Sequence, residues 1–228
     1  MNIPEACFFD LDGVLLDTEP IHAKAWQESA KVYGKLLSDE QLNNLKGKRR
    51  VDCAKEIIKY IDKEISIGDF LTTHRSIIPN LMNKPNAMDG AEKLVRSFVN
   101  YKITIALVSS TSDSSYKNKS KHHQWLNIFK IKILGDDQDL KAGKPSPDPY
   151  LLAAKKLSVN PRNAWAIEDS VSGMQSAIDA GCKVWLLQEK IRYESKLNTQ
   201  SQNTNDRVIP ITSLSLLEEE LKLLIQST

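Results

Sequence analysis

The stretch Ala6-Cys-Phe-Phe-Asp-Leu-Asp-Gly13 is an apolar run that ends abruptly in two aspartates and a glycine. Ala6 to Phe9 is typical of a short buried strand. Asp10 and Asp12 follow it two residues apart, and in extended backbone such side chains point the same way. Two carboxylates at the end of a strand suit a hard divalent cation, which prefers oxygen ligands and can bind a phosphate at the same time. The stretch therefore predicts a site for phosphoryl chemistry.

The chain has 228 residues, with 31 lysines and arginines against 29 aspartates and glutamates. This balance gives no overall field that attracts nucleic acid or an anionic membrane, so any attraction for phosphate must be local. The three cysteines match no CxxC or zinc spacing, and the sequence shows neither a charged leader nor an apolar run long enough to cross a membrane. We therefore expect a cytoplasmic protein, monomeric, that binds neither nucleic acid nor membranes.

Residues 17–86 show only helical periodicity, without the alternation of a strand. Ser38-Asp-Glu-Gln41 matches a capping box, which opens a helix. The predicted helical segments are 21–33, the segment that begins at 38, 51–61 and 67–82. We predict an all-helical domain at 17–86, inserted into a core domain that comprises 1–16 and 87–228.

Beyond this insertion, predicted helices and strands alternate. The helices are expected at 88–100, 114–125, 150–157 and 171–180, and the strands at 103–108, 130–134, 164–167 and 184–187. A polar loop at 188–206, an edge strand at 208–211 and a closing helix at 213–225 complete the chain. Such alternation predicts an α/β fold with a doubly wound parallel sheet, which binds ligands at the carboxyl ends of its strands.

Polar side chains follow each of the first four strands. They are Asp10 and Asp12, then Ser109-Ser-Thr-Ser112, then Lys144-Pro145 in a loop, and finally Glu168-Asp169-Ser170. Carboxylates that hold a metal, hydroxyl donors and an ammonium are what a transferring phosphoryl group needs for positioning and charge neutralisation. We therefore expect these side chains to meet at one edge of the sheet.

Four motifs, in this order and spacing, resemble the haloacid dehalogenase superfamily over nearly the whole chain, up to about Leu187. They are Asp10-x-Asp12-Gly-Val, Ser109 after an apolar strand, Lys144-Pro-x-Pro-Asp148 and Glu168-Asp169-Ser. The helical insertion is similar to the cap of the β-phosphoglucomutase and sugar-phosphatase branch. The resemblance implies a Rossmann-like core with an inserted all-helical cap that closes over the site and selects the substrate.

The resemblance also implies roles for the two aspartates. Asp10 would attack the substrate phosphorus and form an aspartyl-phosphate. Asp12 would protonate the leaving oxygen and then deprotonate the water that hydrolyses the intermediate. Dehalogenases of the superfamily lack this second aspartate and its transport ATPases have threonine there, so Asp12 favours a phosphatase or a phosphomutase.

A magnesium ion is the cofactor that the resemblance implies. Its ligands would be the Asp10 carboxylate, the Asp12 backbone carbonyl and Asp169, with Glu168 beside them. Taken alone, such a residue also has a simpler interpretation: Asp169 could simply be the cap of the following helix. The occurrence of such residues at four strand ends together favours the metal site.

The substrate phosphate would be bound by hydroxyls and a cation. The resemblance implies that Ser109 and Ser110 contact phosphoryl oxygens and that Lys144 neutralises charge on the phosphate and on Asp10. Taken alone, Ser109 could be a turn residue and Lys144 a solvated lysine before a proline.

Four residues of the insertion are further candidates for contact with the substrate, by resemblance to β-phosphoglucomutase: His22, Lys46, Gly47 and Arg50. A histidine on an amphipathic helix is also commonly structural, and the basic run at 46–50 could be a solvated loop. Trp26 is expected in the core of the insertion. Arg50 is the strongest candidate, because a guanidinium binds phosphate or sugar oxygens bidentately.

The activity we expect is hydrolysis of a small phosphorylated metabolite, most readily a sugar phosphate. The alternative is a β-phosphoglucomutase-type phosphomutase, which must bind a second phosphate. Such mutases carry Lys-Asn shortly after the motif serine, where this chain has Ser112-Asp113. Loss of a cation and gain of a carboxylate weaken a site for a dianion, which favours the phosphatase.

An alternative of another class is a non-catalytic module that binds phosphate or nucleic acid. Its basis is a basic cluster formed by Lys117, Lys119, Lys121, His122 and His123. A run of charges is usually a solvated face, and stacking aromatics are nearly absent from this one, so the enzyme remains the favoured interpretation.

Overall fold

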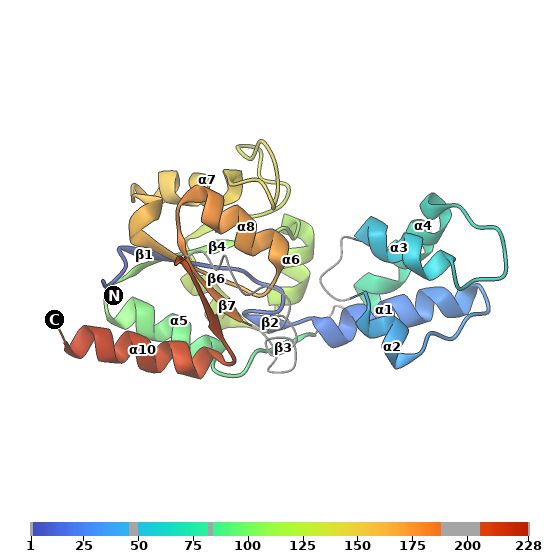
Figure 1. Cartoon of the computed structure of the whole chain (residues 1–228), viewed down its shortest axis with the longest axis horizontal. Coiled ribbons are helices and arrows are strands. Elements are labelled where there is room, and N and C mark those ends of the chain that lie inside the picture. The colour runs from blue at the N-terminus through green and yellow to red at the C-terminus, as the bar shows by residue number, and fades with distance from the viewer. Residues whose placement is uncertain (1, 46–49, 82–83, 188–205, 228) are drawn as a thin grey trace. The chain divides into compact units, whose positions relative to one another are not determined.

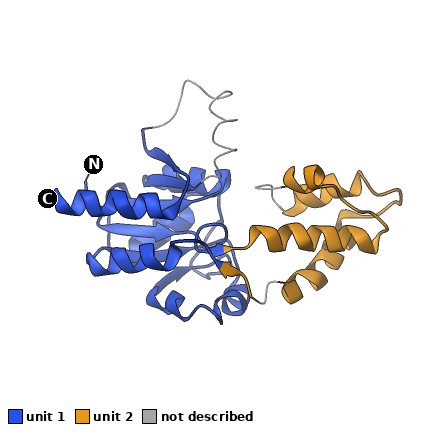
Figure 2. Cartoon of the chain, turned by 90° about the horizontal axis from the view of Figure 1, so that it is seen from below, with its two compact units in different colours: residues 1–16, 87–228 blue, residues 17–86 orange. Residues whose placement is uncertain are grey.

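The computed structural model describes residues 2–45, 50–81, 84–187 and 206–227. The chain divides into two compact units, one formed by residues 1–16 and 87–228 and the other by residues 17–86 (Figure 2). Two short strands, β2 (Leu16–Asp17) and β3 (Asn86–Ala87), pair where the chain passes between the units.

The larger unit is built on a six-stranded sheet with the order β5-β4-β1-β6-β7-β8, and all of its neighbouring strands are parallel. The strands are β1 (Ala6–Phe9), β4 (Thr104–Val108), β5 (Ile131–Ile133), β6 (Ala164–Glu168), β7 (Lys183–Leu187) and β8 (Val208–Ile211). This topology confirms the predicted doubly wound sheet. Strands β4 and β5 lie on one side of β1, and the chain then crosses over to β6, β7 and β8 on the other side, so the carboxyl end of β1 lies at a switch point.

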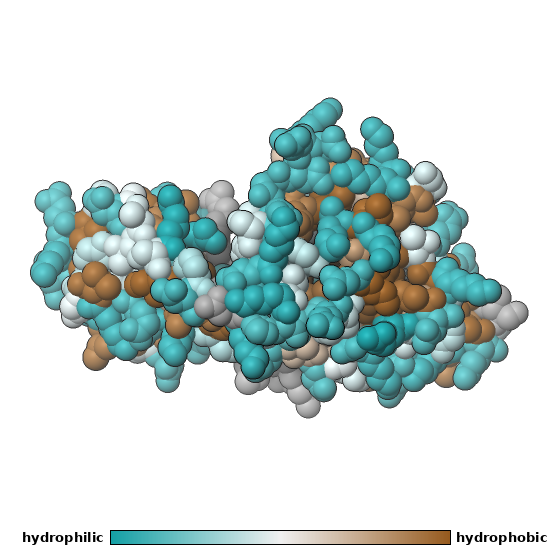
Figure 3. All heavy atoms as spheres, turned by 180° about the vertical axis from the view of Figure 1, so that it is seen from behind, coloured by the Kyte–Doolittle hydropathy of each residue, from teal (hydrophilic) through white to brown (hydrophobic). Residues whose placement is uncertain are grey.

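Helices cover both faces of the sheet (Figure 1). One hydrophobic cluster joins the strands to α5 and α10, and a second joins them to α7 and α8. The α-helices in the described residues of this unit are α5 (Ala91–Asn100), α6 (Asp113–Ser120), α7 (Asp148–Leu157), α8 (Val171–Ala180) and α10 (Leu214–Gln226). On the face drawn in Figure 3, hydrophobic side chains reach the surface between hydrophilic ones.

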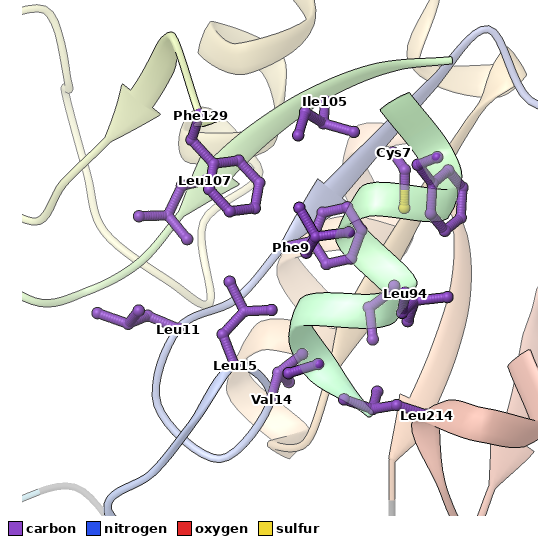
Figure 4. Packing of buried hydrophobic residues seen from close by; sticks show 14 of the residues in the cluster. Cys7, Phe9, Leu11, Val14, Leu15, Leu94, Ile105, Leu107, Phe129 and Leu214 are labelled. Atoms are coloured by element: carbon purple, nitrogen blue, oxygen red, sulfur yellow. The ribbon is translucent and has the colours of Figure 1, made fainter. Parts of the chain in front are cut away.

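Strand β1 is buried on both faces because its side chains alternate between the two clusters. Cys7 and Phe9 belong to the cluster with α5 and α10, and Ala6 and Phe8 to the cluster with α7 and α8. Figure 4 shows Phe9 among the side chains of the first cluster, where its ring centroid lies 5.6 Å from that of Phe129. A continuous apolar run is what a strand covered on both faces requires, and it fixes the chain immediately before the two aspartates.

The predicted helix over 114–125 is wrong in its second half. The α-helix α6 ends at Ser120, and a short 3-10 helix follows at Gln124–Ile128. Only Tyr116 and Lys119 of α6 are buried. The helix therefore gains little stability from packing against the core, and nothing of this kind extends it beyond Ser120.

At the C-terminal end, β8 and α10 confirm the predicted edge strand and closing helix. The Ser213 hydroxyl caps α10 by accepting the Leu216 N–H at 3.3 Å. The predicted polar loop at 188–206 lies outside the described residues up to residue 205. Within the described part of the chain, none of the helices is both long enough and apolar enough to cross a membrane.

Apart from one residue each of β2 and β3, the regular secondary structure of the smaller unit's described residues is all helical. Its helices are α1 (Glu19–Val32), α2 (Asp39–Asn43), α3 (Arg50–Ile58) and α4 (Ile67–Leu81). Ser38 forms the predicted capping box with Gln41. Trp26 is buried in the core of this unit, as expected, and its ring stacks on His74 with the centroids 3.6 Å apart.

His74 is a fully buried histidine whose Nδ1 lies 3.1 Å from the Ser29 hydroxyl oxygen. Burial lowers the pKa of His74 to about 4, and the nearby charges of Arg50 and His22 act in the same direction. The unfolded chain keeps an ordinary histidine pKa, so between pH 6.5 and pH 4 it takes up a proton that the folded chain does not.

We expect this difference to make stability depend on pH. The free energy of unfolding should fall as pH drops from 6.5 to 4, with His74 contributing up to about 3 kcal/mol of the loss. Urea denaturation in steps of pH should show a flatter dependence for His74→Phe than for the wild type. His122→Phe, at an exposed position, is the control and should keep the wild-type slope. Equal slopes for His74→Phe and the wild type would contradict the expectation.

Candidate active site

One lysine joins the ends of three neighbouring strands of the sheet. Lys144, in the loop before α7, donates from Nζ to Asp10 Oδ1 and to Glu168 Oε1, at 2.6 Å in each case. It also donates to the Val108 carbonyl at 2.9 Å. Since these residues lie at or just beyond the carboxyl ends of β1, β6 and β4, the predicted meeting of strand ends occurs.

Three acids at this edge are close enough to hold a cation. Asp10, Glu168 and Asp169 each offer a carboxylate oxygen, and these oxygens lie within 4.8 Å of one another. Lys144 donates to two of them, Asp10 and Glu168, and three ionised carboxylates carry more negative charge than its one ammonium balances. An all-oxygen set with excess negative charge fits a divalent cation such as Mg²⁺.

Two glycines make room for these acids. Gly13 has a φ of +87°, which favours glycine, and a Cβ at this position would overlap the Asp169 carboxylate. A Cβ at Gly173 would likewise overlap the Glu168 carboxylate. The backbone therefore approaches both carboxylates too closely for a side chain to fit at these two positions.

Burial and neighbouring charges set the protonation of the buried pair. Burial raises the pKa of Asp10 to about 7, while the Lys144 ammonium opposes this and Glu168 adds to it. Burial alone would lower the pKa of Lys144, but the Asp10 and Glu168 carboxylates raise it above its usual range. Lys144 is therefore a permanent cation in this site.

Glu168 is fully buried, and both of its carboxylate oxygens accept hydrogen bonds from the protein. The Tyr150 hydroxyl donates to Oε1 at 2.5 Å, in addition to Lys144, and the Ser170 hydroxyl donates to Oε2 at 3.3 Å. Sequence reasoning did not identify Tyr150 as part of the site. The available signal in the sequence was its position in the first turn of the helix after the lysine loop.

Asp12 has a lysine of its own, which the sequence interpretation assigned to a solvated basic cluster. Lys119 Nζ lies 2.7 Å from Asp12 Oδ1 and 2.8 Å from Oδ2, and its side chain is only 4% exposed. The Thr111 hydroxyl donates to Asp12 Oδ2 at 3.1 Å. The placement of Lys119 in a solvated run was therefore wrong. Its spacing of three residues from the apolar Tyr116, which puts both on one face of the helix, was the available signal.

The serines after β4 differ in exposure. Ser109 is buried, and its hydroxyl accepts the Thr111 N–H at 3.1 Å, whereas Ser110 is exposed. The Ser112 hydroxyl accepts the Ser115 N–H at 3.4 Å and so caps α6. Binding of phosphate by Ser109 and Ser110 stays a prediction.

Two of the four predicted substrate contacts of the helical unit, His22 and Arg50, lie on its described helices. His22 is half-buried on α1, and Arg50 is exposed as the first residue of α3. Lys46 and Gly47 lie outside the described residues. Contact of these four residues with a substrate stays a prediction.

Comparison with a protein-family model identifies the family of this chain. The model of the haloacid dehalogenase-like hydrolases matches residues 7–187, most of the chain. The chain belongs to this family. The predicted family is thereby confirmed, and the matched residues include all four motifs at the edge of the sheet.

Individual relatives of this hydrolase act on different phosphates. (DL)-glycerol-3-phosphatase 1, mitochondrial, of Arabidopsis thaliana is 28% identical over 207 residues, 88% of this chain and 68% of the relative. The bifunctional riboflavin kinase/FMN phosphatase of Arabidopsis thaliana is 31% identical over 184 residues, which cover 80% of this chain. The matched part spans 48% of that relative, about half of its length.

A solved structure confirms the fold. The crystal structure of a HAD family hydrolase from Deinococcus radiodurans R1, with bound phosphate and sodium, superposes with a TM-score of 0.76. The two chains are 24% identical, and the match covers 98% of this chain and 97% of the other. The likeness shows a shared fold.

Removal of the bridging lysine of this hydrolase should lower the free energy of unfolding. Lys144→Met leaves the buried Asp10 and Glu168 carboxylates without the cation between them, and loss of one partner from a buried ion pair costs about 3–5 kcal/mol. We expect the free energy of unfolding to fall by about 3 kcal/mol in metal-free buffer at neutral pH, as measured by urea denaturation.

A surface lysine on α7 provides the matched control. Lys156 Nζ lies 3.1 Å from Asp137 and 3.2 Å from Asp139, in a partly exposed ion-pair group. Such pairs contribute less than about 1 kcal/mol, so Lys156→Met should change little. A similarly small loss for Lys144→Met would show that the fold does not depend on the buried bridge.

Proposed function

We propose that this hydrolase is a magnesium-dependent phosphatase of a small phosphorylated metabolite, with the phosphate on a sugar or polyol. The observation that carries the proposal is the position of Asp10, held by Lys144 in a group of carboxylates that fits a divalent cation. The named substrates of the two relatives, glycerol 3-phosphate and FMN, both carry a phosphate monoester on a polyhydroxyl chain.

The reaction we assign proceeds in two displacements at phosphorus. An Asp10 carboxylate oxygen forms a bond to phosphorus as the bond from phosphorus to the ester oxygen breaks, and Asp12 gives its proton to the departing alcohol. Asp12 then takes a proton from a water molecule, whose oxygen attacks phosphorus and displaces Asp10. Inorganic phosphate leaves, and both aspartates return to their starting state.

Other residues supply charge and binding in this scheme. Bound Mg²⁺ would supply positive charge for the phosphoryl oxygens, held by Asp10, Asp169 and the Asp12 backbone carbonyl, with Glu168 beside them. Lys144 adds a second, fixed positive charge next to Asp10. We assign contacts with the phosphoryl oxygens to Ser109 and Ser110.

The surroundings of Asp113 support a phosphatase over a phosphomutase. Its carboxylate pairs with Lys117 at 2.6 Å on the exposed face of α6, and its backbone N–H donates to Asp136 Oδ1 at 2.8 Å. Phosphomutases of the family place a lysine and an asparagine here for a second phosphate. Two carboxylates at this place oppose the binding of a dianion.

The structure also weakens the alternative of a binding module. Lys119 is withdrawn from the predicted basic cluster to Asp12, and Lys117 is paired with Asp113. The remaining members, Lys121, His122 and His123, form too small a basic surface to bind nucleic acid through its phosphates.

Asp10→Asn tests the proposed nucleophile. An amide oxygen is a poor nucleophile, so we expect phosphate release to fall roughly a thousandfold or more, while cooperative unfolding is retained. Asp139→Asn, at an exposed carboxylate, is the control and should keep the wild-type rate. Substantial turnover by Asp10→Asn would remove Asp10 as the nucleophile.

Metal removal and a substrate panel test the class of reaction. We expect release of phosphate from one or a few sugar and polyol phosphates, its loss in EDTA and its recovery with added Mg²⁺. β-Glucose 1-phosphate with a trace of the bisphosphate is run alongside. Formation of glucose 6-phosphate without release of phosphate would show a phosphomutase instead.

A further inference from the structure

Lys119 is a buried cation that the proposed reaction leaves without a role. Its Nζ lies 2.7 Å and 2.8 Å from the two carboxylate oxygens of Asp12, and 2.9 Å from the Thr111 hydroxyl oxygen. A buried ammonium is costly unless it is paired. Lys119 lies near the end of a polar helix, yet its ammonium is buried against Asp12 and not solvated. Its withdrawal to Asp12 therefore indicates a specific purpose.

Thr111 forms the third corner of this group. Its hydroxyl accepts from Lys119 and donates to Asp12 Oδ2 at 3.1 Å. Its N–H donates to Ser109 Oγ at 3.1 Å, and its carbonyl accepts the Gly135 N–H at 2.8 Å. Thr111 is thus fixed through its backbone on both sides, so its hydroxyl offers Asp12 an immobile partner.

The position of Lys119 is fixed as well. It lies one turn beyond Tyr116, and these are the two buried residues of α6. The Ser112 hydroxyl caps the start of this helix, and the helix start determines where the Cα of Lys119 lies. With both oxygens engaged by the same ammonium, the Asp12 carboxylate cannot rotate freely about its terminal bond.

We infer that Lys119, together with Thr111, is a positioning residue for Asp12 that sets where its carboxylate lies relative to the departing oxygen of the substrate. The inference rests on the proposed function, which gives Asp12 the proton transfer. Proton transfer requires a heavy-atom separation of hydrogen-bond length, and displacement of a catalytic group by about 1 Å can cost roughly a hundredfold in rate. Loss of Lys119 should therefore weaken proton donation to the alcohol.

The test compares phosphate esters whose alcohols differ in acidity. p-Nitrophenolate leaves without a proton, whereas the alkoxide of glycerol phosphate needs one, so only the second substrate depends on Asp12 as an acid. The kinetic constant to measure is kcat/KM with Mg²⁺, because it excludes the later hydrolysis of the aspartyl-phosphate. Phenyl phosphate provides an intermediate case.

Lys119→Met keeps the aliphatic stem and removes the charge. We expect its kcat/KM to fall at least about tenfold for glycerol phosphate and less than about threefold for p-nitrophenyl phosphate. Thr111→Val should also lower kcat/KM more for glycerol phosphate than for p-nitrophenyl phosphate, by a smaller factor than Lys119→Met. Lys117→Met is the matched control, because Lys117 is on the same helix with a side chain that is 72% exposed, and it should leave both constants unchanged.

A steeper dependence on leaving-group acidity supports the inference. An equal fall for all esters, as a loss of folded enzyme would produce, or a shallower dependence overturns it. Circular dichroism and thermal unfolding establish that the variants fold, and Thr111→Val decides the question if Lys119→Met does not. A wild-type enzyme that hydrolyses none of the esters with Mg²⁺ would instead overturn the proposed function, and the inference with it.

Discussion

The bridge from Lys144 to Asp10 and Glu168 is the interaction on which the candidate site depends. Charges of this kind cost several kcal/mol each to bury, and a buried ion pair recovers this only with good geometry and further hydrogen bonds. Here the geometry is good, since both distances are 2.6 Å and Tyr150 and Ser170 satisfy Glu168 further. The partners of Lys144 lie 134 and 24 residues away along the chain, so the bridge forms only when β1 and β6 are paired.

A second lysine gives the two aspartates of the first motif different surroundings. Asp10 and Asp12 are two residues apart and repel each other when both are charged. Lys144 reaches Asp10 from the loop before α7, and Lys119 reaches Asp12 from α6. Asp10 is buried and Asp12 is partly exposed, with 27% of its side chain accessible. This difference in surroundings suits the different tasks that we assign to the two carboxylates.

The order of helices and strands could be predicted because periodicity and turn residues are local signals, and the four motifs were found because each follows a strand directly. Lys119 was misplaced because its partner is 107 residues away and periodicity reports the burial of apolar side chains, not of a cation. Tyr150 was missed because a helical tyrosine looks like ordinary core. The length of α6 was overestimated because the sequence does not reveal how little of it packs against the core.

The two acids of the last motif are adjacent in the sequence, yet the structure separates their possible roles. Glu168 ends β6, is fully buried, and uses both oxygens to accept hydrogen bonds from Lys144, Tyr150 and Ser170. Asp169 is half-buried, and its carboxylate lies against the backbone of Gly13, where no larger residue would fit. Lys144 is one of these three donors to Glu168, so Glu168 and Asp10 hold the same ammonium between them. In the metal site that we propose, Glu168 would hold Lys144 in place beside the cation, and Asp169 would be a direct ligand.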